Sequence, residues 1–327
     1  MTRALPLALG ALTVALFAAS LAVGPAGVPW GRSLAALLRD DGLQTLVMRE
    51  IRLPRALLAV MVGASLGLAG AAMQGYLRNP LAEPGIIGVS GSAALGAVIA
   101  IHSGLAAAFT LGLPLLALAG AAIGVALILL LAGPRGSSLT LILAGIAISA
   151  RAGALTSLAL NIAPNPFAVS EIVFWMMGSL QDRSMTHVWI AAPFMALGWA
   201  LLLSLGRALD ALTLGEDAAQ AMGVSLTQVR LMLVFGVASA VGAATAVSGA
   251  IGFVGLVVPH LLRPFVGARP SRLLLASAAG GAAMVLAADI AVRLILPDRD
   301  LKLGVLMALV GAPLFLHLIY KTRREIA

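Results

Sequence analysis

Long apolar runs alternate with short polar segments along almost the whole chain. A helix that crosses a membrane needs about 20 consecutive apolar residues, and most of the runs are near or above that length. Two of them, 89–103 and 257–266, are too short to cross alone. Hydropathy therefore predicts an all-α polytopic membrane protein with eight to ten spans. The apolar runs lie at 5–23, 55–77, 89–103, 106–132, 139–162, 187–206, 226–247, 257–266, 273–294 and 304–320.

The first apolar run, Leu5–Val23, follows a single cation, Arg3. The apolar core of a secretory signal peptide is only about 7–15 residues long, whereas this run approaches the length of a full span. We expect an uncleaved first helix, and a cleaved signal peptide is the alternative.

Residues 78–91, RNPLAEPGIIGVSG, interrupt the apolar pattern most sharply. Pro80 and Pro84 lack an N–H and disfavour helix at the residue before each of them. Irregular backbone is tolerated in a membrane only at a surface, inside protein or along a water-filled path. A second glycine–proline break, IGFVGLVVPHLLR, occupies 251–263. Paired breaks in two halves of a chain indicate a transport pathway, and a short polar turn is the alternative.

Composition excludes a soluble globular domain. The chain has 327 residues, of which 61% are hydrophobic and 10% charged, against roughly 25% charged residues in soluble domains. The net charge of +8 lies between apolar spans, so it indicates membrane topology rather than nucleic-acid binding. The chain contains no cysteine, which excludes disulfides and thiolate metal sites.

No catalytic constellation is visible in the sequence. A phosphate-binding P-loop needs a glycine-rich stretch followed by Lys and then Ser or Thr, and neither Lys302 nor Lys321 lies in one. We therefore expect no enzyme activity, and an ATP-driven process would need a separate motor chain. No pair of histidines has the spacing of metal ligands; they are His102, His187, His260 and His317.

Several motifs, in order, resemble the FecCD-type permeases, the membrane subunits of type II ABC importers for vitamin B12, iron–siderophores and heme. The resemblance runs from about Arg49 to Tyr320. It implies the type II ABC importer permease fold with about ten transmembrane helices and a single transmembrane domain over 1–327. The motifs are RLPR at 52–55, MQGYLRNPLAEPGIIGVSGSAALG at 73–96, LILAG at 141–145, LGEDAAQAMG at 214–223, SGAIGFVGLVVPHLLR at 248–263 and GAPLF at 311–315.

The same resemblance implies partners and a location. Two copies of such a permease form the pathway, two ATP-binding cassette subunits bind its inner loops, and a periplasmic substrate-binding protein delivers the cargo. We expect a multi-pass protein of the bacterial inner membrane, surrounded by lipid, with ATP on the partner subunit and no permanently bound cofactor. Both termini should be cytoplasmic, although the bias of positive charge between the two sides is weak.

Polar segments outside the spans supply further expectations. The outer segment 24–54 could hold an interfacial helix around Trp30–Arg39. The outer segment 163–186 has an amphipathic middle ending in Trp175, which could anchor at the membrane interface. The inner segment 207–225 fits one or two short helices ended by Gly215 and Gly223.

The resemblance also assigns roles to particular residues. It places a cytoplasmic gate at Asn79, Pro80 and Leu81 together with Ser137 and Ser138. It makes 207–225 the ATPase coupling loop, with Leu214, Gly215, Glu216, Asp217 and Gly223 as its motif; a solvated loop is the alternative. It assigns docking of the binding protein to Arg52, Arg55 and Arg293, for which simple snorkelling at helix ends is the alternative.

Two charges are expected inside the membrane, Arg151 and Asp289. An unpaired Arg there costs at least about 2.5 kcal/mol, so Arg151 suits either an anionic cargo or a salt bridge within the bundle. Asp289 is expected to pack between helices. The stretch RDLKLG at 299–304 departs from the family's E-x-P-x-G and looks like the heme branch, because Asp300 replaces Glu and Lys302 replaces Pro.

These observations together predict the permease subunit of an ABC importer that moves heme by alternating access at a homodimer interface. Ferric siderophore and vitamin B12 are the alternative cargoes. A self-sufficient secondary transporter is the rival from another class, and the near absence of carboxylates within the spans argues against it. An integral-membrane enzyme is disfavoured because His, Glu and Cys do not cluster.

Overall fold

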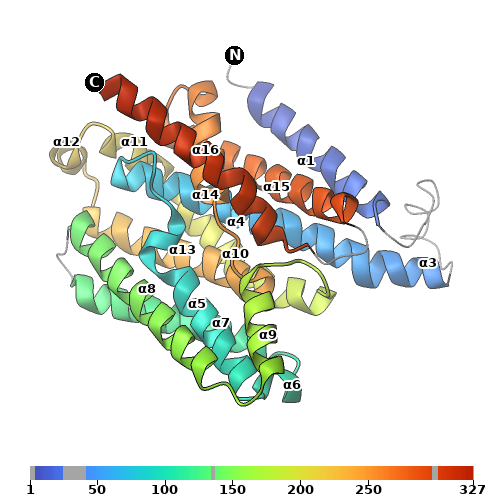
Figure 1. Cartoon of the computed structure of the whole chain (residues 1–327). Coiled ribbons are helices and arrows are strands. Elements are labelled where there is room, and N and C mark those ends of the chain that lie inside the picture. Colours follow the sequence, from blue (N-terminus) through green and yellow to red (C-terminus); the bar gives the residue numbers. More distant parts are fainter. Residues whose placement is uncertain (1–3, 25–41, 134–136, 297–300, 327) are drawn as a thin grey trace.

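The computed structural model describes residues 4–24, 42–133, 137–296 and 301–326, and every regular element in those ranges is helical (Figure 1). The ten long or membrane-embedded helices are α1 (Ala4–Ala22), α4 (Leu53–Leu77), α5 (Val89–His102), α7 (Gly112–Ala132), α8 (Ser138–Asn161), α10 (Met185–Ser204), α13 (Leu226–Ser248), α14 (Val254–Leu262), α15 (Pro270–Ile295) and α16 (Leu303–Ile326). The short ones are α3 (Leu43–Leu46), η1 (Val47–Arg52), η2 (Pro84–Ile87), α6 (Leu105–Ala108), α9 (Pro166–Met176), α11 (Gly206–Leu212), α12 (Glu216–Ala221) and η3 (Arg263–Val266).

Seven of these helices are long and apolar enough to cross a membrane, counting α3, η1 and α4 as one continuous span. At 1.5 Å per residue, α5 is about 21 Å long and α14 about 14 Å long, both short of a hydrocarbon core of about 30 Å. The prediction that the third and eighth spans are too short to cross alone is therefore confirmed. With α5, α14 and α16 the bundle has the expected ten spans.

The predicted fourth span, 106–132, is wrong at its beginning. The chain forms the short helix α6, leaves helical geometry at Phe109, and starts again as α7 at Gly112. A side chain at Gly112 would press against the carbonyl group of Leu105. The tight return of the chain, rather than hydropathy, therefore sets where this span begins.

Helix α4 forms the centre of the bundle and packs against α10, α13, α14 and α15. Its glycine-rich stretch 63–70 lies directly on the backbones of two neighbours. A Cβ at Gly63 would overlap the main chain of Gly281, and one at Gly70 would overlap the main chain of Gly255. Small residues permit such close approach in membrane helices, so GASLGLAG at 63–70 is a packing motif.

A second glycine-mediated contact joins α5 to α7. Gly120 and Gly124 lie against Ser92, and added side chains there would overlap the serine. The stretch GAAIG at 120–124 is therefore a packing motif as well. The two contacts define two tightly packed groups of helices, α4 with α14 and α15, and α5 with α7.

The expectations for the connecting segments have different outcomes. The inner segment 207–225 contains two short helices, α11 and α12, and Gly215 and Gly223 both have positive φ, as predicted. The outer helix expected near Trp30–Arg39 lies outside the described residues. The outer helix α9 exists, but its Trp175 is only 8% exposed and packs among small residues of α5 and α13. Trp175 is therefore a core residue, and its prediction as an interface anchor is wrong.

The packing of α4 gives a direct stability prediction. Gly70→Ala should destabilise the permease by about 1–3 kcal/mol, because the new methyl group meets backbone that cannot move aside alone. Thermal unfolding in detergent should show a clearly lower midpoint. Gly10→Ala on α1 is the matched control, since nothing lies within 4 Å of its added Cβ. Equal midpoints for the two variants would contradict the close contact.

Candidate translocation pathway and coupling surfaces

The two interrupted segments found in the sequence lie against each other. Helix α4 ends at Arg78, whose backbone is left-handed (φ 49°), and the chain then runs to Glu83 before η2. The Glu83 carboxylate accepts a hydrogen bond of 3.1 Å from the backbone N–H of Phe253. Phe253 is itself left-handed (φ 67°) and precedes the first residue of α14. One side chain from the first break thus holds the strained turn of the second.

Gln74 adds a second connection between the same segments. Its side-chain amide donates to the Leu256 carbonyl (3.2 Å) and accepts from the Arg263 guanidinium (2.8 Å). We call the set Gln74, Glu83, Phe253, Leu256 and Arg263 the inner joint. It satisfies polar backbone where α14 starts, as irregular structure at membrane depth requires.

Three members of the inner joint, Gln74, Glu83 and Arg263, were not assigned a role from the sequence. The available signal was Gln74, an amide inside an otherwise apolar run, because a polar side chain at that depth needs a partner. The sequence could not name that partner, since Arg263 is far away along the chain.

The predicted gate residues form tight turns at the inner ends of two helices. Asn79 accepts a hydrogen bond from the Leu81 N–H (2.9 Å) through its side-chain oxygen, which closes a local turn after α4. Ser137 caps α8 by accepting from the Thr140 N–H (3.2 Å). The segment after Asn79 then reaches α8, because η2 packs against its first half. Pro80 and Ser138, the other predicted gate residues, lie within these two turns.

The predicted coupling residues lie on the surface. Leu214 is 68% exposed, and Glu216, Asp217 and Gly223 are exposed as well. The segment that runs from Leu214 into α12 therefore presents an apolar side chain and two carboxylates outward. The preceding helix α11 is turned inward, with Leu209 fully buried. Gly215, between the two helices, takes a φ of 106° that favours glycine.

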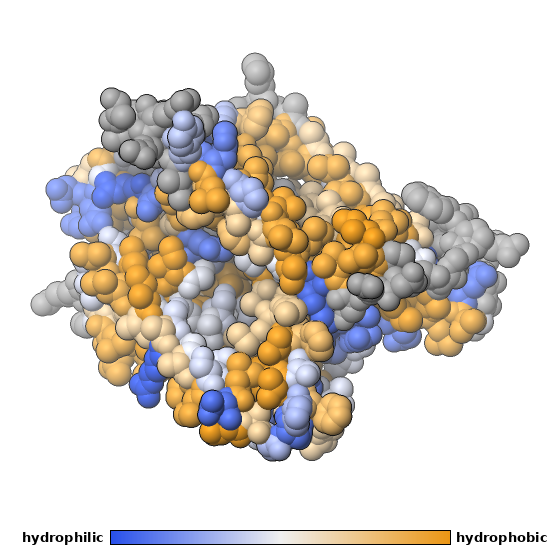
Figure 2. All heavy atoms as spheres, in the orientation of Figure 1, coloured by the Kyte–Doolittle hydropathy of each residue, from blue (hydrophilic) through white to orange (hydrophobic). Residues whose placement is uncertain are grey.

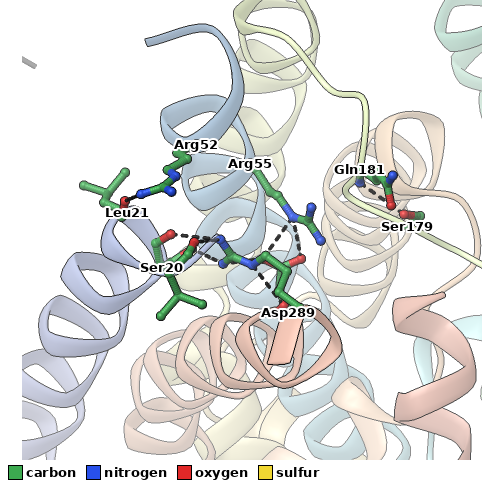
Figure 3. Close-up of polar contacts among 9 residues, drawn as sticks. Ser20, Leu21, Arg52, Arg55, Ser179, Gln181 and Asp289 are labelled. Atoms are coloured by element: carbon green, nitrogen blue, oxygen red, sulfur yellow. Dashed lines mark hydrogen bonds and ion pairs between the residues drawn. The ribbon is translucent and has the colours of Figure 1, made fainter. Parts of the chain in front are cut away.

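The three arginines expected to dock the binding protein belong to an internal cluster (Figure 3). Its centre is Asp289 on α15, which is 1% exposed and pairs with Arg55 Nε (2.9 Å) and Arg293 Nη2 (2.8 Å). Arg52 donates from Nη1 to the carbonyl oxygens of Leu21 (2.9 Å) and Ala22. We call Arg52, Arg55, Asp289 and Arg293 the outer clasp.

The outer clasp completes the end of α1. The last four carbonyls of a helix have no partner within it, and the helix dipole favours cations near this end. Arg293 donates from Nη1 to the carbonyls of Ser20 (2.9 Å) and Val23 (2.8 Å). Arg52 donates to the carbonyls of the two residues between them. Two arginines, one from η1 and one from α15, thus cap a third helix.

This geometry argues against part of the docking expectation. Arg52 is 3% exposed and the side chain of Arg293 is 6% exposed, so neither presents its guanidinium to a partner protein. Arg55 engages Asp289 through Nε, and its terminal nitrogens extend away from the carboxylate in Figure 3. The expectation that Asp289 packs between helices agrees with its place in the clasp.

Arg151 differs from its predicted surroundings. It lies about midway along α8, as expected, but it is exposed on the surface of the single chain instead of buried in the bundle. Within the described part of the chain it has no hydrogen bond or ion pair, so the alternative of an internal salt bridge is not supported. It borders a mainly apolar groove of about 280 Å³ between α5, α7 and α8.

The face of α8 around Arg151 is otherwise apolar. Figure 2 shows apolar side chains over much of the visible surface, interrupted by separate hydrophilic patches. Such a surface suits lipid or a second membrane helix. The exposed large apolar residues of α8 are Leu139, Leu143, Ile146, Leu155 and Leu158.

A polar pocket of about 400 Å³ lies where α9 meets the start of α16. The Lys302 ammonium lies 5.5 Å from the centre of the Phe174 ring in its wall. This position belongs to the unusual RDLKLG stretch, of which Asp300 lies outside the described residues. The pocket is lined by Glu171, Phe174, Trp175, Ser179, Gln181, Asp182, Arg183 and Lys302.

The ten membrane helices of the described ranges, of which α5 and α14 are short and begin at the two interruptions, form an all-helical membrane bundle. The chain belongs to the FecCD transport family, whose model matches residues 12–321. It is therefore the permease subunit of an ABC importer of the iron-chelate, heme and vitamin B12 type, and ATP hydrolysis belongs to another subunit. Family membership decides against a self-sufficient secondary transporter.

Individual relatives agree on this class and differ in cargo. The chain is 40% identical over 304 residues to the Fe(3+) dicitrate transport system permease protein FecD of Escherichia coli, covering 93% of this chain and 94% of the relative. It is 38% identical over 287 residues to the hemin transport system permease protein HmuU of Yersinia pestis, covering 84% of each. A solved inward-facing structure of a metal-chelate type ABC transporter superposes with a TM-score of 0.86 at 37% identity, covering 97% of this chain and 98% of that one.

The outer clasp predicts a strong effect of one carboxylate. Asp289→Ala should destabilise the permease by about 3 kcal/mol or more, because it leaves two largely buried guanidinium groups without their anion. Thermal unfolding in detergent measures the loss. Glu171→Ala removes an exposed carboxylate on α9 and should leave the midpoint nearly unchanged. If the outer clasp contributed little to stability, both variants would show the same small change in the unfolding midpoint.

Proposed function

We propose that this permease imports heme across the bacterial inner membrane by alternating access between two copies of the chain. The observation that carries the proposal is Arg151, a cation at mid-depth on α8 with no partner among the described residues. An arginine in such a place needs water or an anion. The propionates of heme are carboxylates attached to a large apolar ring, and they suit one cation in apolar surroundings.

The alternative that a second copy neutralises Arg151 has little support. The carboxylates at membrane depth are Glu83 and Asp289, and each is engaged within its own chain, in the inner joint and the outer clasp. A partner copy would therefore have no uncommitted carboxylate to offer at this depth. An anionic cargo remains as the source of charge, and ferric siderophores satisfy this condition as well as heme.

The exposed apolar face of α8 supports the homodimer. In a dimeric arrangement this face would lie toward the other copy, and Arg151 would border the pathway between them. The turns that hold Asn79–Leu81 and Ser137–Ser138 would then form the inner gate of that pathway. Small polar residues suit a gate because they close a path without adding a charge barrier.

The inner loop supports the assignment of an ATPase partner. Leu214 projects from the turn before α12, and Glu216 and Asp217 project from its first turn, on the same side as the predicted gate. Two cytoplasmic ATP-binding cassette subunits would bind these loops, one per copy. At the other end, the periplasmic binding protein would meet Arg55, the one predicted docking arginine that is not committed to capping α1. This arrangement requires cytoplasmic termini.

Uptake by proteoliposomes that contain the permease, its ATPase and its binding protein tests the cargo. We expect ATP-dependent heme uptake, with ferric siderophore and vitamin B12 transported at least tenfold more slowly. Faster uptake of either alternative would overturn the heme assignment while leaving the importer class intact.

Arg151→Ala tests the role of the cation. Loss of one charge contact to the cargo should lower heme uptake at least tenfold, which corresponds to about 1.4 kcal/mol, while assembly and ATP hydrolysis persist. Arg151→Lys should retain much of the uptake because it keeps the charge. Unchanged uptake in Arg151→Ala would remove the residue from the pathway, and a failure to assemble would assign it a structural role.

A further inference from the structure

The inner loop is bonded to a membrane helix at one point that neither the motifs nor the family assignment indicates. Asp210 on α11 accepts two hydrogen bonds from Ser271 in the first turn of α15. The backbone N–H of Ser271 lies 2.9 Å from Oδ1, and its hydroxyl lies 2.6 Å from Oδ2. Asp210 is half-buried there, and the neighbouring Leu209 is fully buried.

These bonds cap the first turn of α15 with a side chain from another helix. The first N–H groups of a helix have no internal partner, and the helix dipole favours an anion at this end. The residue before α15, Arg269, makes no side-chain capping bond. The carboxylate of Asp210 supplies the cap instead, through hydrogen bonds that are strong because the acceptor is charged.

Helix α15 extends this connection through the whole protein. Asp289 of the outer clasp lies about 27 Å further along the helix at 1.5 Å per residue. Between the two ends, Gly281 packs on the backbone of Gly63 in α4. A displacement of the first turn of α15 therefore cannot be absorbed locally, because close-packed backbone moves together.

The two short helices of the loop consequently have different tasks. Glu216 and Asp217 of α12 and Leu214 just before it are exposed, whereas α11 is fixed inward by Asp210 and Leu209. We infer that Asp210 is a positioning residue that passes movement of the coupling loop to α15, and through it to α4 and the outer clasp. This inference rests on the proposed coupling role of 207–225.

Single substitutions in the complete importer test the connection. Asp210→Ala removes both hydrogen bonds and should lower cargo transported per ATP hydrolysed at least fivefold, with ATP hydrolysis retained. Asp210→Asn should stay within twofold of the wild type, because the amide can accept from the Ser271 N–H and donate to its hydroxyl. Ser271→Ala loses only the hydroxyl bond and should give an intermediate loss.

Ser204→Ala is the matched control for Ser271→Ala. Its hydroxyl is exposed and bonds only within its own helix, to the Leu201 carbonyl (2.7 Å). Transport per ATP should therefore not change. Should Asp210→Ala fail to assemble, Ser271→Ala carries the test. Unchanged transport per ATP in both variants, or a parallel loss in Ser204→Ala, would overturn the inference.

A charge reversal on α12 separates this inference from the coupling proposal itself. Glu216→Arg with Asp217→Arg should weaken the association of the ATPase with the permease, whereas Asp210→Ala should leave that association unchanged. Wild-type association in the double reversal would contradict the coupling assignment. Weakened association combined with full transport per ATP in Asp210→Ala would contradict only the role of Asp210.

Discussion

The inner joint is the interaction on which the rest of the structure depends. Two stretches of irregular backbone must be placed at membrane depth, where unsatisfied polar groups are costly. Glu83 holds the N–H of Phe253, while Gln74 joins the carbonyl of Leu256 to Arg263. Because side chains at the first break form hydrogen bonds with the polar groups of the second, α5 and α14 can begin inside the protein as short helices. Paired breaks of this kind are typical of transport pathways.

The close packing of α4 makes the joint possible and connects it to both ends of the molecule. Gly70 allows the start of α14 to approach α4 closely, and Gly63 allows α15 to approach α4 nearer the outer clasp. Helix α15 carries the outer clasp at one end and the bond to Asp210 at the other. The coupling loop, the joint and the clasp are therefore linked through one pair of helices. The proposed alternating access would depend on linkage of this kind.

The features predicted correctly from the sequence are those that local physics determines. Apolar length predicted the spans, and prolines and glycines predicted the breaks. The features that the sequence did not predict are pairings between distant residues. An arginine at the end of a helix is compatible with both docking and capping, and the position of α1 shows that Arg52 and Arg293 cap it. The burial of Trp175 and the hydrogen bonds of Asp210 likewise depend on neighbours that are distant in the sequence.

Hydrogen–deuterium exchange of the assembled permease tests the inner joint most directly. Glu83→Ala removes the acceptor for Phe253, whereas Glu83→Gln keeps an oxygen that can accept the same bond. The account predicts that peptides covering 249–256 exchange at least tenfold faster in Glu83→Ala than in the wild type, with Glu83→Gln close to the wild type. It also predicts that outer peptides covering 163–176 remain unchanged in both variants. Equal protection of 249–256 in Glu83→Ala and the wild type would contradict the claim that one break holds the other.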